Sequence, residues 1–176
     1  NTNYLSKEIS KWKYPLNFID FETATPAIPP YKGLSAYEMI TFQYSIHTLK
    51  ESGEVEHSSQ FLSVSANEFP NLSFIKQLTS DLSKNVGSIF MWYPHESTSL
   101  KAIQKQILKL NLAKEYEVEL AFIDTLLAGG DRELIDLFAL SKNGIFYPNS
   151  KRSKSIKKVL PATINHSKFI QDKYSN

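Results

Sequence analysis

Residues 16–22 read LNFIDFE, and this stretch decides the fold that we expect for the chain. It is a short, almost entirely apolar run that ends in acids, which is typical of a buried central β-strand. Asp20 and Glu22 lie two residues apart, so on a strand both side chains leave the same face. Leu16 and Phe18 precede them on that face and are expected to join the core. The stretch therefore predicts a strand that carries two carboxylates at its end.

The segments around this strand predict a mixed sheet with helices on its faces. The expected strands are residues 16–22, 40–49, 55–64 and 88–93, and the expected helices are residues 69–82, 97–110 and one that begins at Ser155. Residues 65–67 supply the start signal of the first helix, whereas residues 119–127 and 131–140 mix helical and strand patterns. A meander of about three strands followed by strand–helix units implies an α/β fold.

The composition is that of an ordinary globular protein. The 176 residues fit one domain, and 41% of them are hydrophobic, which suffices for a buried core. The absence of cysteine excludes disulfides and thiol nucleophiles and is typical of a reducing cytoplasm. Residues 1–12 lack the apolar run of a secretory signal, and no window approaches the roughly 20 apolar residues that cross a bilayer. We therefore expect a cytoplasmic protein without a membrane partner.

Charge is distributed unevenly along the chain. Residues 1–141 contain 12 Lys and Arg against 17 Asp and Glu, whereas residues 142–176 contain 8 Lys and Arg against Asp172 alone. The net charges of the two parts are thus −5 and +7. A basic segment of this kind indicates a face that binds a polyanion or, equally, a solvated tail.

Carboxylates at the end of a buried strand are costly unless positive charge neutralises them. Their oxygens favour a hard divalent cation, Mg²⁺ or Mn²⁺. Glu96 follows a second predicted strand, so it would complete a two-metal site that activates water and stabilises the leaving oxygen of a phosphodiester. Plainer interpretations stay open. Asp20 and Glu22 can be solvated residues at a strand end, and Glu96 can be a helix-start acid favoured by the macrodipole.

Other catalytic patterns are poorly represented. The chain has no Walker-type glycine loop and no G-x-S-x-G elbow. The histidines, His47, His57, His95 and His166, show no metal-ligand spacing, and most of them are expected at the surface or in packing contacts.

Several motifs together resemble the bacterial family called domain of unknown function 2779. They are FIDFETATPAIPPYKGLSAYEMITFQYSIH at residues 18–47, HESTSL at 95–100, IDL at 135–137 and SKSIKKVLPA at 153–162. The family is similar to the DnaQ-like, DEDD-type 3′–5′ exonucleases. The resemblance thus implies an RNase H-like mixed β-sheet of about five strands flanked by α-helices. We expect it to form one domain at residues 15–176, after an extension at residues 1–14.

On this resemblance, Asp20 and Glu22 take the place of the first exonuclease motif, and Glu96 takes that of the acid in the second. The implied cofactor is a pair of Mg²⁺ or Mn²⁺ ions held by these three residues. Asp136 matches a family acid and is assigned a catalytic role near the site. The fourth acid of a complete DEDD site would lie on a late helix, which we expect to be absent because Asp172 does not align with it.

The resemblance also implies contacts to nucleic acid. Gln43 is expected to touch substrate, although a solvent-facing strand glutamine has the same pattern. Ser155 and the lysines after it are expected to form a phosphate-facing helix start. The predicted contacts are Gln43, Arg152, Ser155, Lys157 and Lys158.

The leading hypothesis is a metal-dependent 3′–5′ exonuclease that acts on a single-stranded end of DNA or RNA, within a longer chain that has other domains. The alternatives are a nucleic-acid-binding module that kept the fold without the chemistry, and a module that docks a partner. The missing fourth acid and Trp92, which stands where related enzymes often carry a polar residue, motivate the first alternative. Cleavage that needs metal distinguishes the enzyme from a module whose binding is salt-sensitive and persists in EDTA.

Overall fold

A computed structural model describes residues 2–65, 67–144 and 155–174. The chain divides into two compact units. The larger unit is Trp12–Ile135, and the smaller unit consists of Asn1–Lys11 and Asp136–Asn176. No helix in the described part of the chain combines the length and apolar character needed to cross a membrane.

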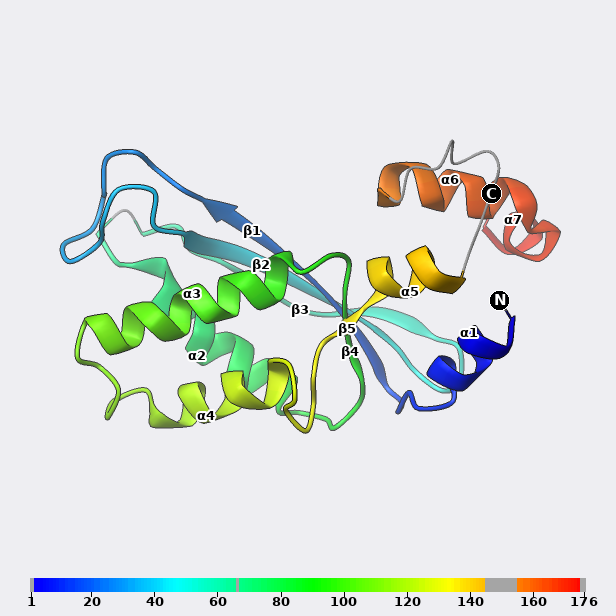
Figure 1. Cartoon of the computed structure of the whole chain (residues 1–176), viewed down its shortest axis with the longest axis horizontal. Coiled ribbons are helices and arrows are strands. Elements are labelled where there is room, and N and C mark those ends of the chain that lie inside the picture. Colours follow the sequence, from blue (N-terminus) through cyan, green and yellow to red (C-terminus); the bar gives the residue numbers. More distant parts are fainter. Residues whose placement is uncertain (1, 66, 145–154, 175–176) are drawn as a thin grey trace. The chain divides into compact units, whose positions relative to one another are not determined.

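The larger unit is built on a mixed β-sheet, as the sequence predicts. The strands are β1 (Leu16–Ala24), β2 (Ile40–Leu49), β3 (Val55–Leu62), β4 (Ile89–Met91) and β5 (Ile135–Asp136). Their order across the sheet is β3-β2-β1-β4-β5 (Figure 1), and the chain passes from the larger to the smaller unit between Ile135 and Asp136 of β5. β1 pairs antiparallel with β2 and parallel with β4. The expected α/β class with a mixed, five-stranded sheet is therefore confirmed.

The three predicted helices are present with adjusted boundaries, and α1 and α7 are additional to the prediction. The larger unit contains α2 (Pro70–Leu82), α3 (His95–Lys109) and α4 (Glu117–Leu126), and the smaller unit contains α1 (Thr2–Ile9), α5 (Leu137–Gly144), α6 (Ile156–His166) and α7 (Lys168–Tyr174). The start signal expected at residues 65–67 is not used, because α2 begins at a proline, whose missing N–H costs nothing in the first turn. The region of mixed pattern at residues 119–127 is helical, whereas that at 131–140 divides into β5 and α5.

The core of the larger unit lies between one face of the sheet and the helices α2, α3 and α4 (Figure 1). Ile19 and Phe21 of β1 point into it beside Tyr44 and Ile46 of β2, and all four side chains are at most 5% exposed. Since side chains alternate along a strand, the neighbouring residues of β1 must face the other way. The opposite face of the sheet is therefore the one that carries the carboxylates.

A close approach at Gly87 aligns β4 with β1. The Asn17 N–H donates to the Ser88 carbonyl, and the Ser88 N–H donates to the Lys13 carbonyl, both at 2.8 Å. A Cβ atom at Gly87 would overlap the carbonyl of Pro15, so only glycine fits this contact. Because β4 runs parallel to β1, this alignment brings the helix that follows β4 to the end of β1 that carries the acids.

Candidate functional site

Asp20 and Glu22 lie on the face of β1 that is opposite the core. Both side chains are exposed, whereas Ile19 before them and Phe21 between them are buried. Phe18 precedes them on the same face and stacks on Phe90 of β4, with ring centroids 5.0 Å apart. The predicted pairing of the two acids on one face is therefore present, and both carboxylates are accessible to a ligand.

Polar residues of β2 lie beside these acids. Gln43 is the cross-strand partner of Glu22, and Ser45 is the partner of Asp20. Directly opposed residues on one face of an antiparallel pair have Cβ atoms about 5 Å apart. Gln43 is exposed, and a bulge between Glu22 and Thr23 interrupts the regular pairing next to it. This position fits both interpretations of Gln43, a substrate contact and a solvent-facing strand residue.

Glu96 lies in the first turn of α3 and is only 3% exposed. It belongs to the stripe of α3 that includes the fully buried Leu100 and Ile103, so its side chain points toward the sheet and not toward solvent. A contact of 3.3 Å between Thr23 Oγ1 and His95 Nε2 joins the end of β1 to the start of this helix. The third predicted acid is thus positioned near the strand end that follows Asp20 and Glu22.

The donor chemistry of these three residues suits a hard divalent cation, because all the ligand atoms would be carboxylate oxygens. In the arrangement that the side chains adopt, however, the described residues contain no group of three or more His, Asp or Glu side chains that could hold a metal ion. The backbone thus brings the start of α3, which carries Glu96, close to the end of β1 that carries Asp20 and Glu22, without forming a ready-made ion site among the described side chains.

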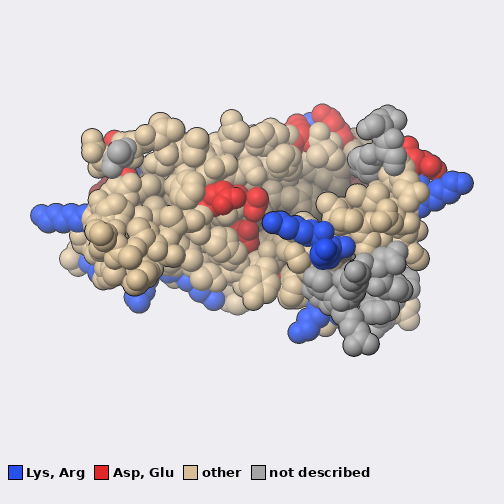
Figure 2. Space-filling view, turned by 90° about the horizontal axis from the view of Figure 1, so that it is seen from above, with Lys and Arg blue, Asp and Glu red and all other residues tan. Residues whose placement is uncertain are grey.

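Figure 2 shows a small group of Asp and Glu side chains on one face of the molecule. A local excess of negative charge favours a bound cation and disfavours a bare phosphate. A nucleic-acid ligand near such carboxylates therefore needs a compensating positive charge.

Asp136 lies in the smaller unit, and its contacts there are those of a helix cap. Its Oδ1 atom accepts hydrogen bonds from the backbone N–H groups of Phe138 at 2.8 Å and Ala139 at 3.2 Å. These are the N–H groups at the start of α5 that lack a partner within the helix. Its predicted catalytic role stays a prediction.

The predicted nucleic-acid contacts near the C-terminus lie at the start of α6. Ser155 is the N-cap residue, and its carbonyl accepts hydrogen bonds from the N–H groups of Lys158 and Val159, both at 2.9 Å. Lys157 and Lys158 are exposed in the first turn, where they can reach a ligand as flexible point charges. Arg152 lies outside the described residues.

Comparison with known families agrees with the resemblance read from the motifs. Residues 17–155 match the family described as Domain of unknown function (DUF2779). The chain belongs to this family. Searches of curated proteins and of solved structures gave no match.

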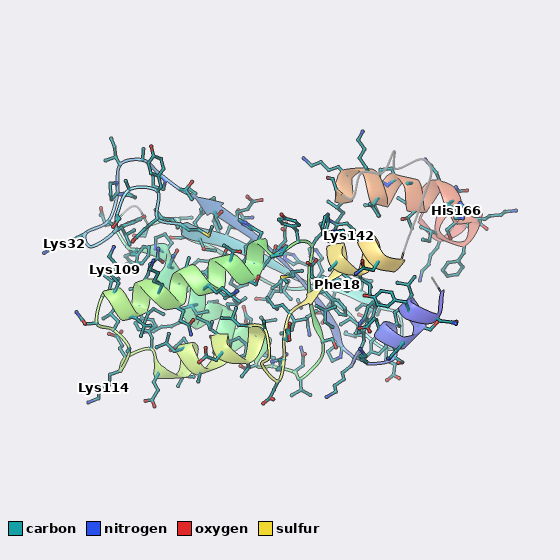
Figure 3. The ribbon with its side chains drawn as sticks, in the orientation of Figure 1. Phe18, Lys32, Lys109, Lys114, Lys142 and His166 are labelled. Atoms are coloured by element: carbon teal, nitrogen blue, oxygen red, sulfur yellow. The ribbon has the colours of Figure 1, made fainter. Side chains whose placement is uncertain are left out.

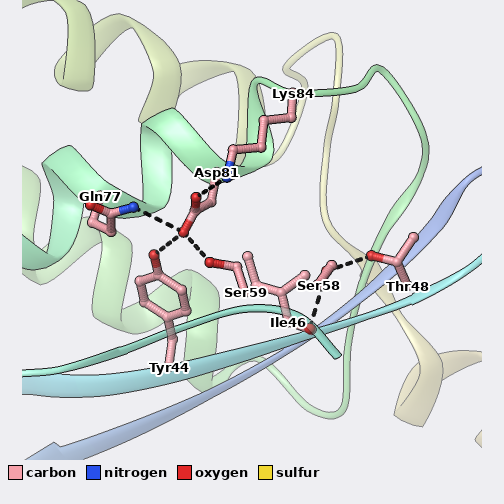
Figure 4. Close-up of polar contacts among 8 residues, drawn as sticks. All are labelled: Tyr44, Ile46, Thr48, Ser58, Ser59, Gln77, Asp81 and Lys84. Atoms are coloured by element: carbon pink, nitrogen blue, oxygen red, sulfur yellow. Dashed lines mark hydrogen bonds and ion pairs between the residues drawn. The ribbon is translucent and has the colours of Figure 1, made fainter. Parts of the chain in front are cut away.

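One buried polar cluster of this DUF2779 domain was not predicted. Asp81 of α2 accepts hydrogen bonds from Tyr44 Oη at 2.6 Å, from Ser59 Oγ, from Gln77 Nε2 at 3.3 Å and from Lys84 Nζ at 2.6 Å (Figure 4). Burial alone would raise the pKa of Asp81, but these hydrogen bonds outweigh it and lower the pKa to about 2. Burial and the neighbouring Asp81 carboxylate raise the pKa of Tyr44 above its usual range.

This cluster borders a cavity of about 250 Å³ on the core side of the sheet, whose lining also includes Asn17, Thr48 and Ser58. These polar groups already bond to one another: Thr48 Oγ1 donates to Asn17 Oδ1 at 3.2 Å and contacts Ser58 Oγ at 2.7 Å. The Asp81 cluster therefore holds α2 against β2 and β3. The sequence carried a partial signal, since Gln77 and Lys84 lie one helical turn from Asp81, but nothing in it indicated the strand partners.

Proposed function

We propose that this domain is a divalent-metal-dependent nuclease that hydrolyses phosphodiesters of DNA or RNA. The observation that carries the proposal is the position of Asp20 and Glu22 on β1 and of Glu96 in the first turn of α3, the helix that follows the adjacent parallel strand β4. In open sheets, ligands bind outside the carboxyl ends of parallel strands. The motif resemblance to DEDD-type exonucleases and the mixed five-stranded sheet support the same function, and only the resemblance supports 3′–5′ polarity.

Each residue has a distinct part in this proposal. Asp20 and Glu22 are exposed, so they would hold one or two Mg²⁺ or Mn²⁺ ions where a strand of nucleic acid can approach. Glu96 would approach the same ions from the protein side, because it is buried at the start of α3. Such ions supply an activated water and neutralise charge on the phosphodiester. The Gln43 amide, opposite Glu22, can donate a hydrogen bond to a phosphate oxygen or a base.

A second candidate function has an observation in its favour. The described residues contain no ready-made group of three metal ligands, and this is the arrangement expected of a module that binds nucleic acid without cleaving it. Such a module would bind single strands equally well with metal and in EDTA. The exposed lysines at the start of α6 would carry that binding.

Cleavage of end-labelled single-stranded DNA and RNA in Mg²⁺, Mn²⁺ and EDTA separates the two functions. We expect stepwise shortening that requires metal and that falls by at least about a hundredfold in Asp20→Asn, because a bound ion contributes several kcal/mol to catalysis. The matched control is Glu51→Gln, which removes one negative charge from the exposed β2–β3 turn and should leave the rate unchanged.

Equal rates for Asp20→Asn and the wild type would contradict the proposed site, even if both cleave. An absence of cleavage in every metal, with binding retained in EDTA, would favour the non-catalytic module.

A further inference from the structure

Two histidines form a stacked pair on the same face of the sheet as the carboxylates. His47 of β2 and His57 of β3 are cross-strand partners, and their ring centroids lie 4.7 Å apart with an interplanar angle of 13°. Both residues are exposed. Neither imidazole forms a hydrogen bond to a side chain or backbone group of the described residues, so their nitrogen atoms are available to a ligand.

Strand register fixes the place of this pair relative to the acids. His47 is the partner of Phe18, and Asp20 follows Phe18 by two residues on the same face. With a rise of about 3.3 Å per residue and about 4.8 Å between strands, the Cα atoms of His47 and Asp20 are separated by about 8 Å. Phe18, labelled in Figure 3, marks the row of the sheet to which the pair belongs. A short stretch of one ligand can therefore reach both groups.

The charge of the pair complements that of a phosphodiester. Imidazole becomes a cation within the range from about pH 8 to pH 5, and each ring then donates charge-assisted hydrogen bonds, which are short and strong to phosphate oxygens. Two cations side by side repel each other, and an anion that contacts both relieves this repulsion. The charged side chains that β1, β2 and β3 place on this face besides the histidines are Asp20 and Glu22.

We propose that His47 and His57 together bind a backbone phosphate of a single nucleic-acid strand, next to the phosphodiester that lies at the carboxylates. This inference rests on the proposed function for the identity of the ligand. It gives the sheet face a positive group that offsets the repulsion between the acids and the strand.

The test is fluorescence anisotropy with labelled oligothymidylate and oligouridylate in EDTA, where metal-dependent cleavage does not occur. The wild type should bind at least about tenfold more tightly near pH 5.5 than near pH 8, as a single charge-assisted hydrogen bond predicts. The variant His47→Asn/His57→Asn should lose most of this gain, and His57→Asn alone should lose part of it. The matched control His166→Asn removes one exposed imidazole from α6 and should keep the pH response. Circular dichroism would verify that each variant is folded.

Other outcomes overturn the inference. These are a wild-type pH response in the folded double variant, an absence of binding to either oligonucleotide at the lower pH, or competition by thymidine monophosphate that equals the oligonucleotide per phosphate. The last result would make a free nucleotide the ligand.

Failure of the histidine site can be distinguished from failure of the proposed function. Metal-dependent cleavage with unchanged binding by the double variant would refute the histidine site alone, whereas histidine-dependent binding without cleavage in any metal would refute the nuclease alone.

Discussion

At the scale of single residues, Gln43 shows how strand register can give a polar side chain a function. Its amide lies opposite Glu22 on the exposed face, so we expect it to orient substrate and not to stabilise the fold. Gln43→Ala should lower the kcat/KM of cleavage about tenfold, the effect of one lost hydrogen bond to a charged group. Its thermal unfolding midpoint should stay within experimental error of the wild type. Gln60→Ala, on the same face of β3, is the matched control, and an equal loss in both variants would contradict a specific role for Gln43.

Asp81 is the residue whose role is structural despite its chemistry. Its pKa of about 2 lies below the ordinary value of 3.8. Its carboxylate therefore stabilises the folded state above about pH 4, and this contribution disappears as the pH falls through about 2. From the size of the shift, the contribution is about 2 kcal/mol. Urea titrations should show that Asp81→Asn is destabilised by roughly this amount at neutral pH and that its unfolding free energy changes less between pH 4 and pH 2.5 than that of the wild type. The control Asp131→Asn alters an exposed acid and should have the unfolding free energy of the wild type. If Asp81→Asn also had the unfolding free energy of the wild type, the cluster would not stabilise the fold.

At this scale the sequence predicts some contacts and not others. The position of Asp20 and Glu22 on one face follows from the two-residue period of a strand, so their spacing in the sequence was enough to predict it. The Asp81 cluster joins α2 to β2 and β3, and the stacked histidines depend on a bulge in the β2–β3 register. Neither pairing has a local signal, because partners on different elements are chosen by tertiary packing.

At the scale of elements, a buried amide network attaches the loop before β2 to two helices. Asn71 of α2 accepts a hydrogen bond from the Thr41 N–H at 2.6 Å and donates to the Met39 carbonyl at 3.1 Å and to Gln106 Oε1 at 2.6 Å. Asn71→Ala would leave buried polar groups without partners, at a cost of about 2–3 kcal/mol. Chemical denaturation measures the loss, and Ser73→Ala on the exposed side of α2 should be near neutral. A near-neutral Asn71→Ala would mean that α2 and α3 are held by apolar packing alone.

Element boundaries followed local signals wherever packing agreed with them. The strand at residues 40–49 was predicted to the residue because its alternation matches the burial of β2. The mixed pattern at residues 119–127 was ambiguous because α4 buries only Ile123 and Leu126 fully, too few positions to establish a period. The order of elements along the chain does not predict the order of strands in the sheet, because β4 pairs with β1 and not with β3, the strand that precedes it in sequence.

At the scale of the whole molecule, the division of charge bears on how a polyanion would be attracted. Residues 1–141 carry a net charge of −5 and would repel a nucleic-acid strand, so the basic residues from Lys142 onward must supply most of the long-range attraction. Each phosphate contact contributes about 0.7 to the slope of log K against log salt for single strands, so Lys157→Gln/Lys158→Gln should reduce that slope by about 1.4. The matched control is Lys32→Gln/Lys114→Gln, which removes two exposed lysines of the larger unit that Figure 3 labels.

Anisotropy titrations over a range of salt concentrations, in EDTA, measure both slopes. A slope that falls equally in the two double variants would mean that nucleic acid senses only the total charge of the protein. A selective fall for Lys157 and Lys158 would show that the start of α6 contacts the strand. Because this contact needs no metal, it would hold for a nuclease and for a non-catalytic module alike. Its combination with the Asp20→Asn cleavage assay therefore separates the residues that attract the strand from those that act on it.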